Sequence, residues 1–141
     1  MRLPLVLVVP QRSRVRVAAD LWSADVIRAP LICLPGDEAI TRNFQRGLRQ
    51  LKVDWPIAIE ASSTSLISQY VAGGCGIGVS VDLPGMASVR GTRVVPLPGF
   101  DPIEVVAMWC HPTDALHRDV LALIRRHAAA LFPCSAGRRA A

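Results

Sequence analysis

Lysine, aromatic residues and long apolar runs are scarce in this 141-residue chain. Arginine supplies fifteen of the sixteen basic residues, Lys52 being the exception, and aromatic residues make up 5% of the sequence. No apolar run reaches the ~18 residues that a membrane-spanning helix needs. The apolar start is interrupted by Pro4 and ended by Pro10 without a prompt small-residue cleavage site, so it is a poor secretory signal. We therefore expect a cytoplasmic protein with no membrane partner.

Residues that build metal, redox and catalytic sites are few and widely spaced. All three histidines follow residue 110, far from any run of hydroxyl residues, and no Cys-x-x-Cys motif occurs. The four cysteines are Cys33, Cys75, Cys110 and Cys134. The first three lie in or beside apolar runs, where a free cysteine behaves as a small buried hydrophobe. The sequence predicts neither a metal ion nor a cofactor.

The acidic residues offer one weak candidate for catalysis. Asp37, Glu38 and Glu60 would approach one another if two adjacent strands ended side by side. Carboxylates on such loops are more often simply solvated, and there is no Gly-x-Ser-x-Gly motif to supply a nucleophile. We expect that the chain is not an enzyme.

Composition and charge indicate one globular domain. Hydrophobic residues make up 51% of the chain and charged residues 19%, which argues against disorder. The net charge is +5, but the arginines are scattered in small groups, at 12–16, 125–126 and 138–139. They are not interleaved with aromatics, and no helix-turn-helix pattern occurs. We interpret them as solvated side chains that support only non-specific association.

The segment from Ile57 to Val81 organises the rest of the chain. It begins with an alternating apolar run, passes through four consecutive hydroxyl residues and continues with helical spacing before paired glycines and a second β-branched run. This order predicts a strand, a helix and a parallel strand joined by a right-handed crossover. The hydroxyl residues Ser62–Ser65 are good N-cap residues, so the helix should start there.

Apolar patterns on either side extend this unit into an α/β sheet. The expected strands cover 3–9, 31–34, 94–97 and 103–109, and the expected helices cover 18–27, 40–51 and 116–131. In the helix over 40–51 the spacing of Ile40, Phe44, Leu48 and Leu51 predicts one buried stripe. The fold class we predict is α/β, with a mixed, mostly parallel sheet, helices on both faces and a C-terminal helix.

The glycines at 73, 74, 76 and 78 do not form a dinucleotide-binding loop. Such a loop follows a strand and precedes a helix, whereas here the helix comes first and the strand second. We predict instead a helix C-cap at Gly73 or Gly74, followed by glycines that let strand and helix pack closely.

The motifs of this segment resemble those of a known family. Glu60-Ala-Ser-Ser, then Leu66-Ile-x-x-Tyr-Val-Ala-Gly-Gly-Cys-Gly-Ile-Gly-Val, is similar to the effector-binding domain of LysR-type transcriptional regulators. The apolar run over 3–10 ending in Val-Pro, and the Asp-Leu and Pro-Leu-Ile pieces at 20–21 and 30–32, follow in the same order. The resemblance covers residues 3–131 and implies a periplasmic-binding-protein-like lobe.

A ligand site and a hinge follow from this resemblance. Helix dipole, free N–H groups and hydroxyls converge where the 57–60 strand ends, which suits an anionic group. The resemblance implies an organic acid or inorganic anion held by Ser62, Ser63, Thr64, Ser65, Pro35, Gly36 and Asp37. It also implies that two crossovers between lobes, Val9–Pro10 and Glu104–Val105, lie side by side and act as the hinge.

The resemblance also implies how the chain is divided. Residues 10–103 would be the second lobe, 1–9 and 104–131 remnants of the first lobe, and 132–141 a flexible tail. The family's winged helix-turn-helix and most of its first lobe have no counterpart here, so DNA contact would need that domain. We also expect a homo-oligomer, and incomplete cover for the helix over 116–131. An alternative is a stand-alone solute-binding or protein-interaction module unrelated to transcription.

Overall fold

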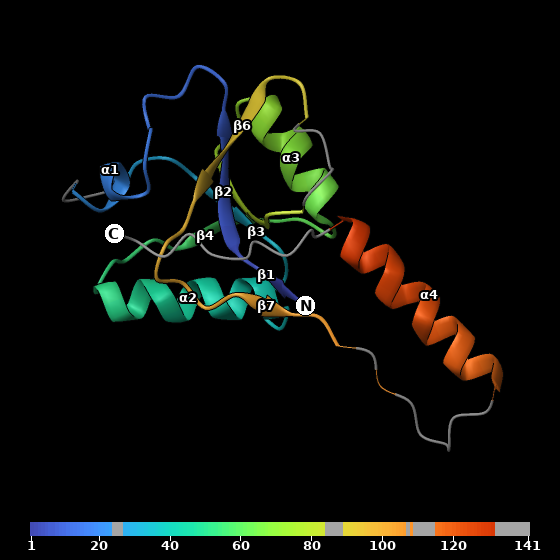
Figure 1. Cartoon of the computed structure of the whole chain (residues 1–141). Coiled ribbons are helices and arrows are strands. Elements are labelled where there is room, and N and C mark those ends of the chain that lie inside the picture. The colour runs from blue at the N-terminus through green and yellow to red at the C-terminus, as the bar shows by residue number, and fades with distance from the viewer. Residues whose placement is uncertain (24–26, 84–88, 107, 109–114, 132–141) are drawn as a thin grey trace, which may run out of the picture.

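The computed structural model describes residues 1–23, 27–83, 89–106, 108 and 115–131. Short strands and helices alternate along most of the chain (Figure 1). The strands are β1 Arg2–Leu3, β2 Leu5–Pro10, β3 Leu31–Cys33, β4 Ile57–Glu60, β5 Ile77–Val81, β6 Thr92–Pro96 and β7 Ile103–Glu104. The helices are α1 Ala19–Trp22, α2 Ala39–Leu51, α3 Thr64–Ala72 and α4 Ala115–Leu131. The cap predicted at Thr113 or Asp114 lies outside the described residues.

Five strands form one mixed sheet in the order β4-β3-β5-β2-β6. β3 pairs in parallel with both β4 and β5, whereas β2 pairs antiparallel with β5 and β6. β1 and β7 form a separate two-stranded antiparallel ribbon. The predicted α/β class with helices on both faces is confirmed, although β2 runs against its neighbours.

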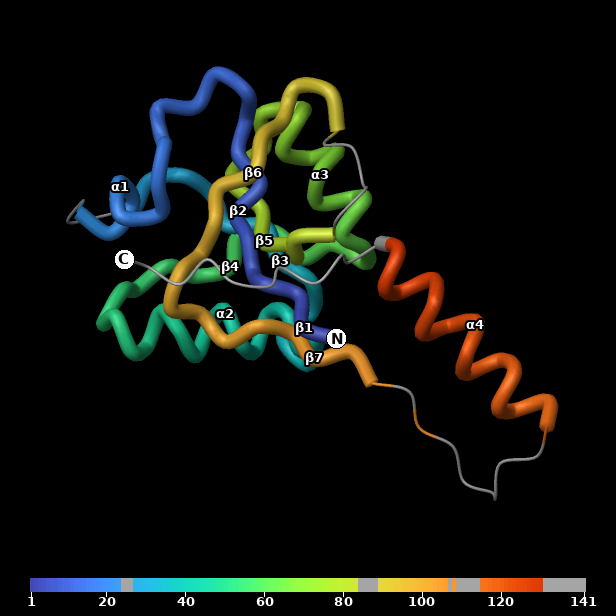
Figure 2. Tube along the Cα trace, viewed as in Figure 1, coloured from blue at the N-terminus to red at the C-terminus, as the bar shows by residue number. Residues whose placement is uncertain are grey.

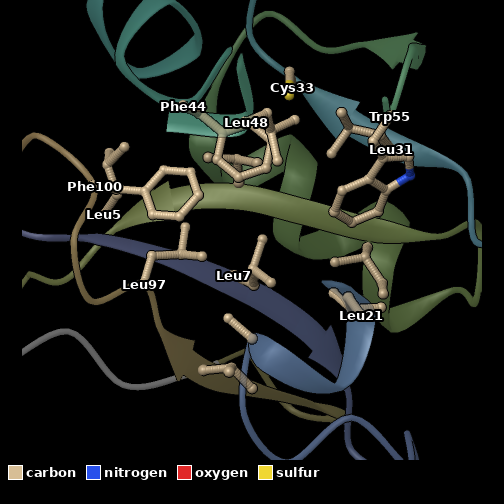
Figure 3. Packing of buried hydrophobic residues seen from close by; sticks show 14 of the residues in the cluster. Leu5, Leu7, Leu21, Leu31, Cys33, Phe44, Leu48, Trp55, Leu97 and Phe100 are labelled. Atoms are coloured by element: carbon tan, nitrogen blue, oxygen red, sulfur yellow. The ribbon is translucent and has the colours of Figure 1, made fainter. Parts of the chain in front are cut away.

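Alternating side chains divide the core into two layers, one on each face of the sheet. Odd-numbered residues of β2, β3 and β5 pack with α1 and α2 around the rings of Phe44, Trp55 and Phe100 (Figure 3). The indole nitrogen of Trp55 donates a hydrogen bond of 2.8 Å to the carbonyl oxygen of Ala29. On the other face Val8 and Ile32 pack against Ile67 and Val71 of α3. The layer on α3 is the smaller of the two.

The crossover from β4 through α3 to β5 forms as predicted. α3 ends in a Schellman motif, because the N–H of Gly74 donates to Val71 O at 3.0 Å and that of Cys75 to Tyr70 O at 3.0 Å. Gly74 has φ +80°, a conformation that favours glycine. A Cβ added at Gly78 would lie 2.2 Å from Cγ2 of Ile67. This glycine therefore sets how closely α3 packs on the sheet.

The two predicted crossovers do not pair with each other. Val9 and Pro10 pair with Arg93 and Thr92 inside the main sheet, because β2 lies between β5 and β6. The segments that lie side by side near residue 104 are instead β1 and β7, with Leu3 opposite Ile103. The hinge expected at Val9–Pro10 and Glu104–Val105 stays a prediction, and residues 5–9 belong to the same sheet as β3 to β6.

The C-terminal part of the described chain packs loosely. Of the strand predicted over 103–109, Ile103–Glu104 form β7, paired with the two-residue β1, and the strand ends before Val105; residues 107 and 109 lie outside the described residues. α4 projects from the sheet (Figure 2), and its apolar residues are exposed as expected. The exposed fractions are 70% for Leu116, 46% for Val120, 57% for Leu123 and 49% for Ile124.

Three smaller predictions need correction. The helix expected over 18–27 forms only over Ala19–Trp22, while 24–26 lie outside the described residues. Leu51 is 50% exposed, because α2 ends at that residue and the backbone turns left-handed at Lys52, with φ 56°. Cys75 is exposed in the turn after α3, whereas Cys33 is buried as predicted; Cys110 and Cys134 lie outside the described residues.

Candidate functional site

The four hydroxyl residues at the start of α3 have different structural roles. Ser63 is the N-cap: its hydroxyl oxygen accepts a hydrogen bond of 3.2 Å from the N–H of Leu66. Ser62 is exposed and lies outside the helix. Thr64 and Ser65 form the first turn, where a backbone N–H has no intrahelical acceptor. The start of α3 therefore keeps donors available at its positive end.

A pocket of about 110 Å³ lies beside this first turn. Its walls come from α3, from the ends of β2, β5 and β6, and from the residues that flank them. The lining residues are Val6, Val8, Thr64, Ser65, Ser68, Ser80, Val81, Asp82, Leu83, Val89, Thr92 and Val94. Valines thus supply an apolar floor, and hydroxyl groups one polar side.

Some of these hydroxyls are already engaged. Ser68 donates to the carbonyl oxygen of Thr64 at 3.1 Å, and Thr92 donates to that of Val89 at 2.7 Å. The hydroxyls of Thr64, Ser65 and Ser80 make no hydrogen bond to any residue in the described part of the chain. These three hydroxyls can bond a polar ligand without giving up an existing hydrogen bond.

Only part of the predicted site lies in this pocket. Thr64 and Ser65 line it, whereas Ser62, Ser63 and the Pro35, Gly36 and Asp37 loop do not. That loop follows β3, and the N–H of Ala61 donates to Cys33 O at 2.9 Å, so the β3 and β4 ends lie side by side as predicted. The pocket sits instead toward β2 and β6, which the antiparallel course of β2 brings to this face.

Sequence reasoning missed Ser68, Ser80, Asp82 and Thr92. Ser68 lies four residues after Thr64, one helical turn along the same face, and this spacing could have indicated it. Ser80 and Thr92 are buried polar residues in strands, at 9% and 5% exposure. They meet the pocket only through the pairing of β2 with both β5 and β6, for which the sequence carries no local signal.

The electrostatics of this region are mild. Asp82 is the only charged residue among the described lining residues, and its exposed carboxylate brings a negative charge to the pocket. Burial raises the pKa of Cys33 to about 12, and the nearby Glu60 carboxylate adds to the effect, so this thiol stays neutral and is no nucleophile. Among the described residues, no group of three or more His, Cys, Asp or Glu is placed to hold a metal ion.

A protein-family model identifies the chain. The model of the LysR substrate binding domain matches residues 1–131. The chain therefore belongs to the LysR substrate-binding domain family. A search of curated proteins gave no match.

Solved structures of regulatory proteins share the fold at low sequence identity. The regulatory domain of Synechocystis CcmR in complex with 2-PG is 17% identical, with a TM-score of 0.70 over 90% of this chain and 64% of that one. The QuiR effector-binding domain in complex with shikimate is 11% identical, with a TM-score of 0.66 over 89% and 61%. HinK, a LysR family transcriptional regulator from Pseudomonas aeruginosa, is 20% identical, with a TM-score of 0.54 over 72% and 37%.

The chain covers only part of each matched structure. It spans less than two thirds of the length of each of the three matched chains. Within the described residues, no helix combines the length and the apolar character needed to cross a membrane.

Proposed function

We propose that this chain is the ligand-sensing lobe of a LysR-type transcriptional regulator and binds a small polar effector in the pocket beside α3. The observation that carries the proposal is the set of unpaired hydroxyls of Thr64, Ser65 and Ser80 around an apolar floor. Family membership supports an effector as the ligand. As part of such a regulator the chain would work in the cytoplasm, within an oligomer.

The size and chemistry of the pocket narrow the ligand class. About 110 Å³ is well below the ~300–1,000 Å³ of pockets for drug-sized ligands, so the pocket fits a small head group. Hydroxyls and free N–H groups at the start of α3 suit the oxygens of a small organic acid, with carbon atoms on Val6 and Val8. The described lining residues include no histidine or cysteine, and we propose binding without a catalytic step.

Effector binding would act through the β1–β7 ribbon. Leu3 lies opposite Ile103 there, and Arg2 forms an ion pair of 2.9 Å with Glu104. This ribbon is the place where the chain enters and leaves the main sheet, so we propose it as the hinge in place of Val9–Pro10. A ligand shifts such a hinge only if it binds the two conformations with different affinity.

A thermal-shift screen of the 141-residue chain with small organic acids, polyols and inorganic anions tests the proposal. Hits are then measured by calorimetry with Thr64→Val and Ser65→Ala. Loss of one hydrogen bond, worth about 1 kcal/mol, should weaken a hit about fivefold in each variant. Ser62→Ala is the matched control, since Ser62 is exposed and outside the pocket, and it should leave the affinity unchanged. If all three variants lowered the affinity for a hit equally, the ligand would not be bound in the pocket beside α3.

A second prediction concerns the charge at the pocket. Asp82 repels an anionic ligand, so Asp82→Asn should tighten binding of an organic acid by about fivefold at low salt, as expected for a loss of roughly 1 kcal/mol of repulsion. The gain should shrink at high ionic strength because mobile ions screen the charge. Calorimetry at two salt concentrations measures both effects. Weaker binding in this variant would show that the carboxylate accepts hydrogen bonds from the ligand, which would then be a polyol or a cation.

A further inference from the structure

Three exposed arginines follow the end of β2 and a fourth precedes the start of β6, and these two segments are in contact. The N–H of Gln11 donates to the carbonyl oxygen of Gly91 at 2.8 Å, which joins the segment after β2 to the turn before β6. This junction lies at the top of Figure 1, at the end of α3 opposite to its hydroxyl-rich start. The four residues, called here the arginine surface, are Arg12, Arg14, Arg16 and Arg90, and all are exposed.

The segment that carries three of these arginines is held in place. The guanidinium of Arg93 donates to Ser13 O at 3.0 Å and also to Val15 O. The carboxylate of Asp20 accepts from the N–H groups of Arg16, at 2.6 Å, and Val17, at 3.1 Å. These two backbone hydrogen bonds lower the pKa of Asp20 below its usual value, and the bond from Val17 has the larger effect.

The side chains of this segment alternate between inside and outside. Ser13 and Val15 are half-buried, whereas Arg12, Arg14 and Arg16 are exposed. The fixed segment therefore presents three guanidinium groups to solvent, with the fourth, on Arg90, across the Gln11 to Gly91 hydrogen bond.

The side chains of the arginine surface form no ion pair within the described part of the chain. The two ion pairs in the described part of the chain join Arg2 to Glu104 and Arg46 to Asp101, and neither involves this surface. The carboxylate of Asp20 contacts the segment through the backbone N–H groups of Arg16 and Val17, and its lowered pKa keeps it negatively charged. It offsets one of the four positive charges, so the surface stays net positive and attracts anionic partners.

We propose that the arginine surface binds the phosphate backbone of duplex DNA without reading its sequence. Planar guanidinium groups match phosphate oxygens in a two-point geometry, and duplex DNA carries one charge per ~1.7 Å of axis. The four residues include no aromatic side chain on which unpaired bases would stack, which favours a duplex over a single strand. The proposal goes beyond effector sensing: this lobe itself contacts DNA, contrary to the expectation that contact needs a separate winged helix.

Fluorescence anisotropy of the intact 141-residue chain with a labelled duplex, over a range of salt concentrations, tests the proposal. If about three phosphates are contacted, the slope of log K against log salt should be about −3, because each contact contributes about −0.9. The variant Arg12→Gln/Arg14→Gln/Arg16→Gln should bind at least 10-fold more weakly at low salt, with the slope reduced to about −1 because Arg90 remains. Circular dichroism of each variant confirms that it is folded.

The matched control is Arg118→Gln/Arg125→Gln/Arg126→Gln. It removes the same charge from exposed positions of α4 and should weaken binding by less than about twofold. Equal losses in the two triple variants would show that net charge alone drives binding and would overturn the proposal. So would displacement of the duplex by polyglutamate as readily as by unlabelled duplex, which would indicate an acidic protein partner. The effector screen does not depend on these arginines, so either proposal can fail alone.

Discussion

Replacement of Gly78 by alanine is expected to destabilise the chain by about 1–3 kcal/mol, the usual range for overpacking a core. The new Cβ would lie 2.2 Å from Cγ2 of Ile67 and 3.1 Å from Cγ2 of Val71, both on fully buried side chains of α3. Cγ2 of isoleucine is bonded to Cβ and moves only with an unfavourable change of χ1, so relief of the clash requires a strained side chain or a shift of α3 against β5. Because α3 carries Thr64 and Ser65, the variant should also lose effector affinity. Urea unfolding followed by circular dichroism measures the stability.

Two further variants separate the clash from the general effect of losing a glycine. Gly36→Ala places its Cβ in open space and should change the free energy of unfolding by no more than about 1 kcal/mol, an effect that acts through the entropy of the unfolded chain. In Gly78→Ala/Ile67→Ala the clashing atom is gone, so the two losses should fall short of additivity by about 0.5–3 kcal/mol. Equal stability of Gly78→Ala and Gly36→Ala, or strict additivity in the double variant, would contradict close packing of α3 on β5.

Local patterns in the sequence were sufficient to predict the β4–α3–β5 unit. Alternation over Ile57–Glu60, helical spacing after Thr64 and paired glycines at 73 and 74 each act over a few residues. Such signals fix an element and its caps without any knowledge of distant contacts. The capping role of the hydroxyl run and the close-packing role of the later glycines were predictable for the same reason.

The pocket was only half predictable because pairing between distant strands builds the rest. A continuous apolar run such as Leu5–Val9 indicates burial on both faces but not direction, so its antiparallel place between β5 and β6 could not be read from the sequence. That pairing brings Ser80 and Thr92 to the start of α3. It also brings two arginine-bearing segments, one after β2 and one before β6, into contact.

Replacement of Phe44 by alanine is expected to cost about 3–5 kcal/mol, a large part of the ~5–15 kcal/mol that holds a domain of this kind together. Phe44 is fully buried in α2. Its ring stacks on that of Phe100 at 5.4 Å between centroids and meets that of Trp55 edge-on at 6.2 Å. The surrounding rings cannot collapse far into the vacated volume, so the cost should lie in the upper part of the range. Chemical and thermal unfolding of the purified variant measure it.

Leu51→Ala is the informative comparison, because helical spacing places Leu51 and Phe44 on one stripe. The buried stripe stops before Leu51, which is the last residue of α2. The backbone turns left-handed at Lys52, and the N–H of Val53 donates to Leu48 O at 3.0 Å, so the chain leaves the helix there. At 50% exposure Leu51 should contribute little, and its replacement should cost about 0.5 kcal/mol or less. Comparable losses at the two positions would mean that something covers Leu51 in solution, and the end of α2 would then be a contact surface.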